Sequence, residues 1–294
     1  MIIRVASAQY NICPIDDIDA FSLQVEGLIA TAASCDVKLF VLPEYFTCQL
    51  LSLTPADLPM SRRIREIAGF KDVYLELLSR LASAHGLYIV GGSIPVVETD
   101  DEIYNDSYFF APSGNIEVQG KIHLTRFEAE DWKMSARTKL KVFETELGKI
   151  AVNICYDVEF PELARAQAQG GAQILAVPSC TDDRQGFIRV RYCAQARTIE
   201  NQIYVIQSST VGSLPAIPDI ALNYGQSSIL TPSDFAFPQD GILSEGPINQ
   251  ESLVVADLDL DKLERARTEG TVRPLKDRAA HDTKGIEAEI VTFS

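Results

Sequence analysis

The sequence predicts an α/β protein in which β-sheets and helices form separate layers. Short β-rich runs alternate along the chain with segments of helical pattern, and this alternation is typical of layered sheet and helix. We expect strands at residues 2–10, 37–44, 87–95, 149–156, 172–179 and 201–209. We expect helices at about residues 20–34, 74–85, 161–169 and 187–200.

Two hairpins complete the predicted elements. Residues 106–112 and 116–121 flank a turn at 113–115, which is typical of a β-hairpin. Residues 226–232 and 252–260 suggest a last pair of strands. Between 212 and 247, Pro and Gly residues cluster, and there we expect surface loops.

Size and composition favour one large domain. The chain has 294 residues, of which 46% are hydrophobic and 23% charged, so it can bury a substantial core. We find no low-complexity linker and therefore expect one domain over residues 1–294. The tail, about 270–294, is charged and irregular, which predicts either a frayed end or an arm that lies on a partner subunit.

The charge balance excludes some classes of partner. With 26 Lys and Arg against 41 Asp and Glu, the formal net charge is −15, which disfavours nucleic acid and anionic membrane surfaces. The first ten residues lack the features of a signal peptide, and no apolar stretch approaches the roughly 20 residues of a membrane span. We therefore expect a cytoplasmic protein. The six cysteines are scattered without a CxxC pair and the histidines number three, so we expect reduced thiols and no metal site.

The strongest local signal is the segment NICYDVEFPELAR at residues 153–165. An apolar strand ends at Cys155, and a helix with Pro161 near its first turn begins soon after. Such a strand-to-helix elbow directs a side chain into a cleft and aims backbone N–H groups at the place of a carbonyl oxygen. This geometry suits a nucleophile, whereas the alternative is that Cys155 is a buried packing residue.

Two other predicted strands also end on a polar residue. Glu44 ends residues 37–44, and Lys121 ends residues 116–121. Either one, taken alone, could be an ordinary solvated side chain. Together with Cys155 they supply a base for the thiol proton, an ammonium for an oxyanion and a nucleophile, which is a complete set for acyl transfer. This interpretation requires the three side chains to meet in one pocket.

The segments LPEYFT (42–47), KIHLTRFE (121–128) and NICYDVEFPELAR (153–165) resemble, in this order, the three signature segments of the nitrilase superfamily of carbon-nitrogen hydrolases. Segments 189–205 and 226–241 are similar to an amidase-like branch that is often fused to an acetyltransferase domain, which these 294 residues do not include. The resemblance implies a four-layer α-β-β-α sandwich, with two mainly mixed sheets face to face and helices outside. It also implies a homodimer or higher homo-oligomer.

By this resemblance, Glu44 is the general base, Lys121 the oxyanion stabiliser and Cys155 the nucleophile. Glu128, seven positions after the lysine, matches a supporting carboxylate, whereas the alternative is a loop salt bridge to a base such as Arg126.

Further residues are expected around the nucleophile. The backbone N–H of Tyr156 is expected to contribute to the oxyanion site. The similar branch places Cys180 and Thr181 at the wall of the substrate pocket, where Tyr45 is also expected. Cys180 could instead be a buried packing residue. His123 is expected to brace the loop after the lysine and not to react.

Three acidic residues follow the nucleophile, namely Asp157, Glu159 and Glu162. We interpret them as complements to the dipole of the next helix and not as a cation site. Many amidase-like members have Arg at the position of Glu159, and this departure leaves recognition of a substrate carboxylate open.

The predicted reaction is hydrolysis of a small linear amide through a Cys155 thioester, with no cofactor. The sequence CYD at 155–157 is similar to amidase-type members. Nitrile or carbamoyl hydrolysis and acyl transfer are alternatives on the same triad. A non-catalytic oligomeric binding protein is the alternative from another class.

Overall fold

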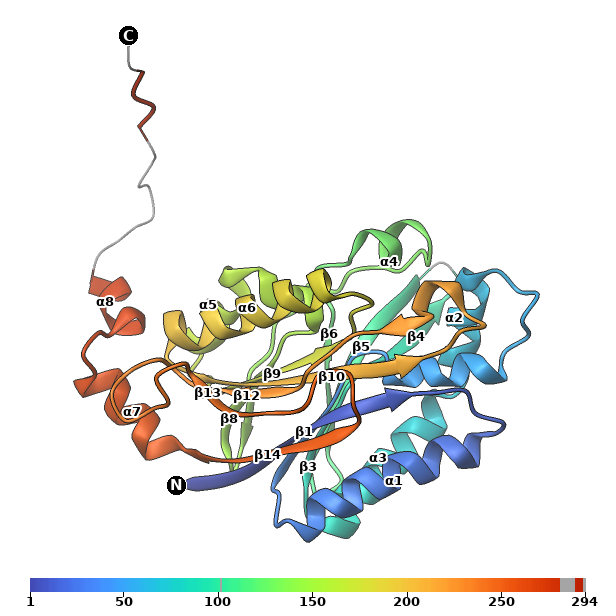
Figure 1. Ribbon diagram of the computed structural model, residues 1–294, viewed down its shortest axis with the longest axis horizontal. Helices are drawn as coiled ribbons and strands as arrows, with labels where there is room; N and C mark the ends of the chain where they lie inside the picture. Colours follow the sequence, from blue (N-terminus) through green and yellow to red (C-terminus); the bar gives the residue numbers. More distant parts are fainter. Residues whose placement is uncertain (101, 281–288, 293–294) are drawn as a thin grey trace.

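The strands form two sheets that face each other between outer helices (Figure 1). The computed structural model describes residues 1–100, 102–280 and 289–292. The first sheet contains β1 (Ile2–Ile12), β2 (Leu39–Leu42), β3 (Tyr88–Gly91), β4 (Ile94–Thr99), β5 (Glu102–Phe110), β6 (Ile116–Gly120) and β14 (Ser252–Asp259). The second contains β7 (Phe143–Thr145), β8 (Gly148–Val152), β9 (Ile174–Ser179), β10 (Tyr204–Ser213), β11 (Leu222–Asn223), β12 (Ser228–Leu230) and β13 (Ile242–Glu245).

The helices lie outside the two sheets (Figure 1). They are α1 (Ile18–Ser34), α2 (Met60–Ala68), α3 (Lys71–His85), α4 (Arg126–Glu130), α5 (Pro161–Gln169), α6 (Arg184–Asn201), α7 (Leu260–Glu269) and α8 (Pro274–Ala280). Three 3-10 turns are η1 (Phe46–Leu53), η2 (Cys155–Glu159) and η3 (Pro218–Ile220). In Figure 1, α1 and α3 lie on one side of the strands, and α5 and α6 lie on the other.

A short seam joins the two sheets. Strands β1 and β10 pair in parallel only over Gln9–Ile12 and Ser209–Gly212. Before the seam, β1 pairs with β14 and β10 pairs with β12, so the sheets separate and face each other. The predicted four-layer α-β-β-α sandwich is confirmed, and its two sheets form one hydrogen-bonded path in the order β4-β5-β3-β2-β1-β10-β9-β8-β7.

Alternating side chains of β1 supply two separate cores. Ala6, Ala8 and Tyr10 belong to the core beneath α1 and α3, whereas Val5 belongs to a core built from both sheets and from α5 and α6. Successive side chains of a strand point to opposite faces, so one strand serves both layers. All four residues are fully buried.

Capping residues explain where two of the predicted helices begin. The carboxylate of Asp17 accepts the N–H of Ala20, and that of Asp183 accepts the N–H of Gly186. A side-chain acceptor at this position satisfies a backbone N–H that has no partner within the helix. Helices α1 and α6 therefore begin two and three residues earlier than the apolar pattern indicates.

One edge of the molecule collects the carboxyl ends of many strands. The neighbours β3, β2, β1, β10, β9 and β8 are all parallel. The predicted hairpin is confirmed as β5 and β6, and because β5 is antiparallel to both β3 and β6, β6 shares the common direction. The chain segments that follow β2, β6, β8 and β9 therefore leave the sheets at the same edge, where α/β proteins place their ligands.

The C-terminal third differs from the sequence prediction in two respects. The predicted last hairpin is wrong, because β14 pairs with β1 and β12 pairs with β10 and β13. The tail from about 270 is not irregular throughout, since α8 contacts α6 and its Leu275 packs against the second core. The rest of the predicted arm at 281–288 and 293–294 lies outside the described residues.

None of the helices in the described part of the chain is both long enough and apolar enough to cross a bilayer.

Candidate active site

The side chains of Glu44, Lys121 and Cys155 come together at the common strand edge. Glu44 lies two residues after β2, Lys121 directly after β6, and Cys155 three residues after β8. Their exposed fractions are 2%, 1% and 5%. The Nζ of Lys121 donates to Oε1 of Glu44 at 2.7 Å. The sulfur of Cys155 lies close enough to both charges for each to affect the pKa of its thiol.

Lys121 is held between two carboxylates. Its Nζ lies 2.8 and 2.7 Å from the two oxygens of Glu128, in addition to its bond with Glu44. Glu128 lies on α4 and is fully buried, and Oε2 of its side chain also accepts the N–H and the hydroxyl of Thr125. Of the two alternatives for Glu128, the loop salt bridge to Arg126 is absent, since Arg126 faces Glu130 at 3.7 Å.

Both oxygens of Glu44 have fixed partners. Oε1 accepts from Lys121 and from Nδ2 of Asn105 at 2.9 Å, and Oε2 accepts the N–H of Cys180 at 3.2 Å. Nδ2 of Asn105 also lies 3.2 Å from Oε1 of Glu128, so one buried amide on β5 contacts both carboxylates. These bonds fix the carboxylate plane next to the thiol.

Burial and charge set the protonation of the site. Burial raises the pKa of the Glu44 carboxyl to about 7, although the Lys121 ammonium opposes the rise. Burial, together with the charge of Glu44, raises the pKa of the Cys155 thiol well above its usual value. Burial lowers the pKa of Lys121, but the carboxylates of Glu128 and Glu44 outweigh it and raise the pKa overall. At rest the site therefore contains an ammonium and a protonated thiol.

Two residues beside the pocket have left-handed backbone conformations. Cys155 has a φ of 48° at the start of η2, and Tyr45, the residue after Glu44, has a φ of 53°. Residues other than glycine adopt this region rarely, and such positions cluster at functional sites. The predicted strand-to-helix elbow is thus present, with α5 beginning at Pro161.

Asp157 connects the lysine loop to the cysteine turn. Its buried carboxylate accepts the N–H groups of His123 at 2.7 Å and of Ile122 and Ile154 at 3.3 Å. Ile122 follows Lys121 directly and Ile154 precedes Cys155, so one side chain holds both loops. Burial raises the pKa of Asp157, and the backbone N–H of His123 opposes the rise. Asp157 also lies in the first turn of η2, where its bond to the N–H of Ile154 caps that turn, so the structure adds the contacts to the lysine loop to the predicted role at a helix N-terminus.

The other residues of this segment have local partners. The ring of His123 stacks on Phe160 with centroids 3.5 Å apart, and its Nδ1 lies 3.4 Å from Asp157. These contacts agree with the predicted bracing role. The carboxylate of Glu159 faces Arg189 at 3.7 Å, and Glu162 is exposed in the first turn of α5.

The expected pocket residues differ in their contacts. The hydroxyl of Tyr45 donates to Glu128 at 2.6 Å. The carbonyl oxygen of Cys180 lies 3.6 Å from the sulfur of Cys155, whereas its own sulfur lies 3.4 Å from Oδ1 of Asn223. The hydroxyl of Thr181 donates to the carbonyl of Tyr224 and so holds a neighbouring loop.

Tyr156, the residue after the nucleophile, has its own local contact. Its ring packs edge-on against Phe160 at 4.9 Å.

A cavity of about 320 Å³ opens next to these residues. Its lining residues are Tyr45, Phe127, Asp131, Trp132, Cys180, Asp182, Pro218, Asp219, Ile220, Leu222 and Asn223. Two of these lining residues also contact the site, because the hydroxyl of Tyr45 bonds to Glu128 and the carbonyl oxygen of Cys180 lies 3.6 Å from the Cys155 sulfur. The cavity therefore adjoins the nucleophile. Among the described residues, no cluster of three or more His, Cys, Asp or Glu side chains is suited to hold a metal ion.

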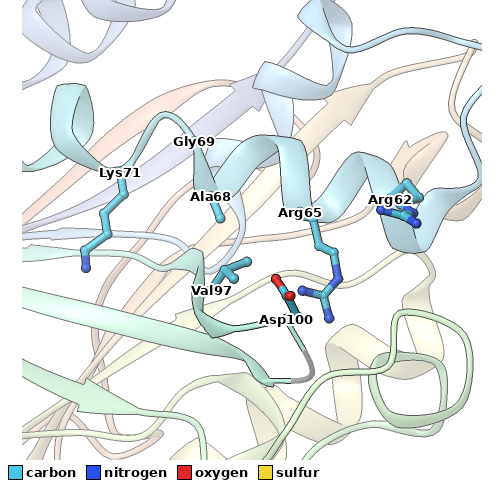
Figure 2. Close-up of a pocket in the computed structure, with 7 residues that line it drawn as sticks. All are labelled: Arg62, Arg65, Ala68, Gly69, Lys71, Val97 and Asp100. Atoms are coloured by element: carbon cyan, nitrogen blue, oxygen red, sulfur yellow. The ribbon is translucent and has the colours of Figure 1, made fainter.

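A larger cavity of about 820 Å³ lies elsewhere, over the end of α2 and the start of α3. Figure 2 shows its lining residues, with the side chain of Arg65 extending toward Asp100 and Lys71 at the other end. None of the triad residues lines this cavity.

The sequence analysis did not identify Asn105 or Trp132 as site residues. It also did not predict that Asp157 holds the loops of Lys121 and Cys155 together. Asn105 is the first of three consecutive polar residues in the middle of β5, with Asp106 and Ser107, and all three are buried. A polar run between apolar residues of a strand is a signal that could have identified it. Trp132 is 1% exposed and its Nε1 donates to Asp219 at 3.0 Å. This contact joins segments 87 residues apart, so no local pattern predicts it.

Comparison with known proteins shows which family this chain resembles. The family model for carbon-nitrogen hydrolases matches residues 4–268. The "Probable hydrolase YhcX" of Bacillus subtilis is 45% identical over 276 residues, which are 94% of this chain and 53% of that protein. This chain thus spans about half the length of that relative. The omega-amidase NIT2 of Danio rerio is 31% identical over 255 residues, 83% of this chain and 84% of the relative.

A solved structure shows the same fold. Nit3 of Saccharomyces cerevisiae, a member of branch 10 of the nitrilase superfamily, superposes with a TM-score of 0.71 at 29% identity, covering 90% of this chain and 93% of that one. The family model covers most of the chain, and the relatives and the fold agree with it. The chain therefore belongs to the carbon-nitrogen hydrolase family of the nitrilase superfamily.

Proposed function

We propose that the chain hydrolyses a small linear amide to a carboxylic acid and ammonia or an amine, with Cys155 as nucleophile, Glu44 as general base and Lys121 as oxyanion stabiliser. The observation that carries the proposal is the buried bond of 2.7 Å between Lys121 and Glu44 beside the Cys155 sulfur. The name omega-amidase of the relative in Danio rerio supports an amide as substrate.

The protonation of the site supports a base-assisted attack. Since the pKa of Cys155 is raised, the thiol stays protonated until a base removes its proton. Glu44, with a pKa of about 7, is tuned for this transfer near neutral pH. As the sulfur bonds to the amide carbon, the thiol proton passes to Glu44, and negative charge develops on the carbonyl oxygen.

In this proposal, the ammonium of Lys121 and the backbone N–H of Tyr156 stabilise that oxygen. Glu128 keeps Lys121 protonated and in place. The leaving nitrogen takes the proton from Glu44 as the carbon–nitrogen bond breaks, which leaves a thioester on Cys155. Glu44 then removes a proton from water, the resulting hydroxide attacks the thioester, and the proton returns to the sulfur as the carboxylic acid leaves.

The test uses hydroxylamine as a second acceptor. The protein is incubated with a panel of short amides, nitriles and carbamoyl compounds, with and without hydroxylamine. Hydroxamate and the acid product are measured, and intact-protein mass spectrometry detects the acyl adduct. We expect turnover of amides, and Cys155→Ala should reduce it by about a thousandfold or more. Cys35→Ser, which changes an exposed thiol outside the site, is the matched control.

Each outcome of this test has a distinct meaning. Turnover of nitriles or carbamoyl compounds but not of amides would assign the triad to those reactions. An adduct on Cys180 and not on Cys155 would overturn the assigned nucleophile. Absence of turnover and adduct across the panel would favour a binding protein over an enzyme.

We also propose that the chain assembles as a homodimer through its outer helices. Tyr192 and Ile199 on α6 support this idea, because these large side chains are 67% and 42% exposed. Light scattering coupled to size exclusion measures the mass, and Tyr192→Glu should shift it toward the monomer. A monomeric wild-type protein would contradict the proposal.

A further inference from the structure

The cavity of about 320 Å³ next to the triad is the place where the rest of a substrate would lie. Its inner wall contains Tyr45, whose hydroxyl binds Glu128, and Cys180, whose N–H binds Glu44. A substrate carbonyl at the Cys155 sulfur would therefore leave its distal end in this cavity. The volume is at the low end of ligand pockets, roughly 300–1,000 Å³, which agrees with a small substrate.

Carboxylates from three separate segments surround the cavity. Asp131 follows α4, Asp182 precedes α6, and Asp219 lies in η3. None of the residues that line the cavity is Lys, Arg or His. The whole chain carries a formal charge of −15, so the mean field of the protein is negative as well. A substrate carboxylate would meet three like charges here and no lining cation.

Aromatic rings form another part of the same wall. The rings of Tyr45 and Trp132 meet edge to face with centroids 5.3 Å apart, and Phe127 meets Trp132 in the same way at 5.0 Å. Tyr45 and Trp132 are nearly fully buried, whereas Phe127 is 42% exposed at the rim. Aromatic faces attract organic cations, and carboxylates pair with ammonium groups. The aromatic rings and the carboxylates of the cavity thus both favour a ligand with a protonated amine.

We propose that the substrate is a small amide whose distal end carries a protonated amine, and that Asp131 and Asp182 determine this preference. The inference rests on the proposed amide hydrolysis and adds to it the class of substrate. Asp219 contributes less, because its Oδ2 already accepts the indole N–H of Trp132. A neutral amide of the same length binds without the charge interaction, and a half-amide of a dicarboxylic acid is repelled.

Three amides with the same carbon chain test the proposal, namely 5-aminopentanamide, pentanamide and glutaramate. Product formation is measured at pH 7.5 and low salt, and the readout is the ratio of kcat/KM between substrates, which a general loss of folded enzyme does not change. We expect 5-aminopentanamide to exceed pentanamide by about tenfold, and glutaramate to be the poorest substrate. High salt should reduce the ratio, because it screens exposed charges.

Substitutions assign the preference to the two carboxylates. Asp182→Asn and Asp131→Asn should each lower the ratio of 5-aminopentanamide to pentanamide by roughly two- to fivefold, and the double variant should remove most of it. Asp182→Lys should improve glutaramate relative to 5-aminopentanamide. Asp36→Asn removes the same charge at an exposed residue that does not line the cavity, and it should leave the ratio unchanged.

The outcomes separate this inference from the proposed function. If the wild type hydrolyses pentanamide but prefers glutaramate, or if the double variant keeps the wild-type ratio, the charge preference is refuted and amide hydrolysis stands. If none of the three amides is hydrolysed and hydroxylamine yields no hydroxamate, amide hydrolysis fails and this inference fails with it. Calorimetry of 5-aminopentanamide with Cys155→Ala measures recognition without turnover, and absence of binding there also refutes the preference.

Discussion

Replacing Asp157 by Asn is the sharpest test of how the site is held together. The carboxylate accepts three backbone N–H groups, at 2.7 Å from His123 and at 3.3 Å from Ile122 and Ile154. Asparagine has nearly the same shape but only one acceptor oxygen. If that oxygen stays on His123, the new NH₂ group faces the N–H groups of Ile122 and Ile154, and both lose their acceptor.

The expected loss of stability follows from these bonds. A buried N–H without an acceptor costs about 1–3 kcal/mol, and the length of the two lost bonds places them in the lower part of that range, so their sum is about 2–4 kcal/mol. Burial raises the pKa of Asp157, which means that its charge is itself unfavourable, and removing that charge offsets part of the loss. We expect a net destabilisation of about 2 kcal/mol, which corresponds to a decrease of roughly 0.7 M in the urea midpoint for an m-value of about 3 kcal/mol per M.

The effect on catalysis should exceed the effect on binding. The two freed loops carry Lys121 and Cys155, and a displacement of about 1 Å between reacting groups can cost about a hundredfold in rate. Circular dichroism in urea measures the midpoint, and steady-state kinetics on the best amide separates kcat from KM. Glu162→Gln is the matched control, since it removes an exposed carboxylate in the same segment. An unchanged urea midpoint together with wild-type kcat would refute the clamp.

Three further predictions concern the carboxylates and the tyrosine of the site. Only ionised Glu44 can accept a proton, and burial raises the pKa of its carboxyl to about 7. The value of kcat/KM should therefore fall about tenfold per pH unit below pH 7. A flat profile between pH 5.5 and 7 would contradict the role of Glu44 as base. Glu128→Gln removes the charge that holds the Lys121 ammonium and should lower kcat/KM by about a hundredfold. The control is Glu130→Gln, which changes an exposed carboxylate on the same helix and should have little effect. Equal effects of both variants would argue against the role of Glu128. Tyr45→Phe removes the hydroxyl that donates to Glu128 and should lower the free energy of unfolding in urea by about 1 kcal/mol. An unchanged urea midpoint would show that this bond is not stabilising.

The sequence predicted the layers and the positions of the site residues because these depend on local patterns. Glu44 and Lys121 were both expected at strand ends, and both lie just beyond β2 and β6. Their meeting could not be derived from spacing, since it depends on the shared direction of β2, β6 and β8, which only the strand pairings reveal. The same limit explains the wrong hairpin, because the partner of β14 is the first strand of the chain.

The details of the site depend on contacts that cross the fold. Asp157 was interpreted as a partner of the helix dipole because it precedes α5 closely in sequence, yet its carboxylate turns inward to the loop after β6. The left-handed conformation of Tyr45 has no sequence signature of its own, because tyrosine adopts it only when the surrounding structure enforces it. Asn105 could have been identified from the sequence. A polar amide within a buried strand needs hydrogen-bond partners, and this need marks the residue as a candidate for the site.

Trp132 is the only tryptophan of the chain, and it stands in the wall of the proposed substrate cavity. Because the ring lines the cavity and its indole N–H is bonded to Asp219, a lining residue as well, a molecule that enters the cavity changes the polarity around the ring. The intrinsic emission of the unlabelled protein therefore reports on occupancy of that one place. Titrations followed by this signal can rank candidate ligands before any reaction product has been identified.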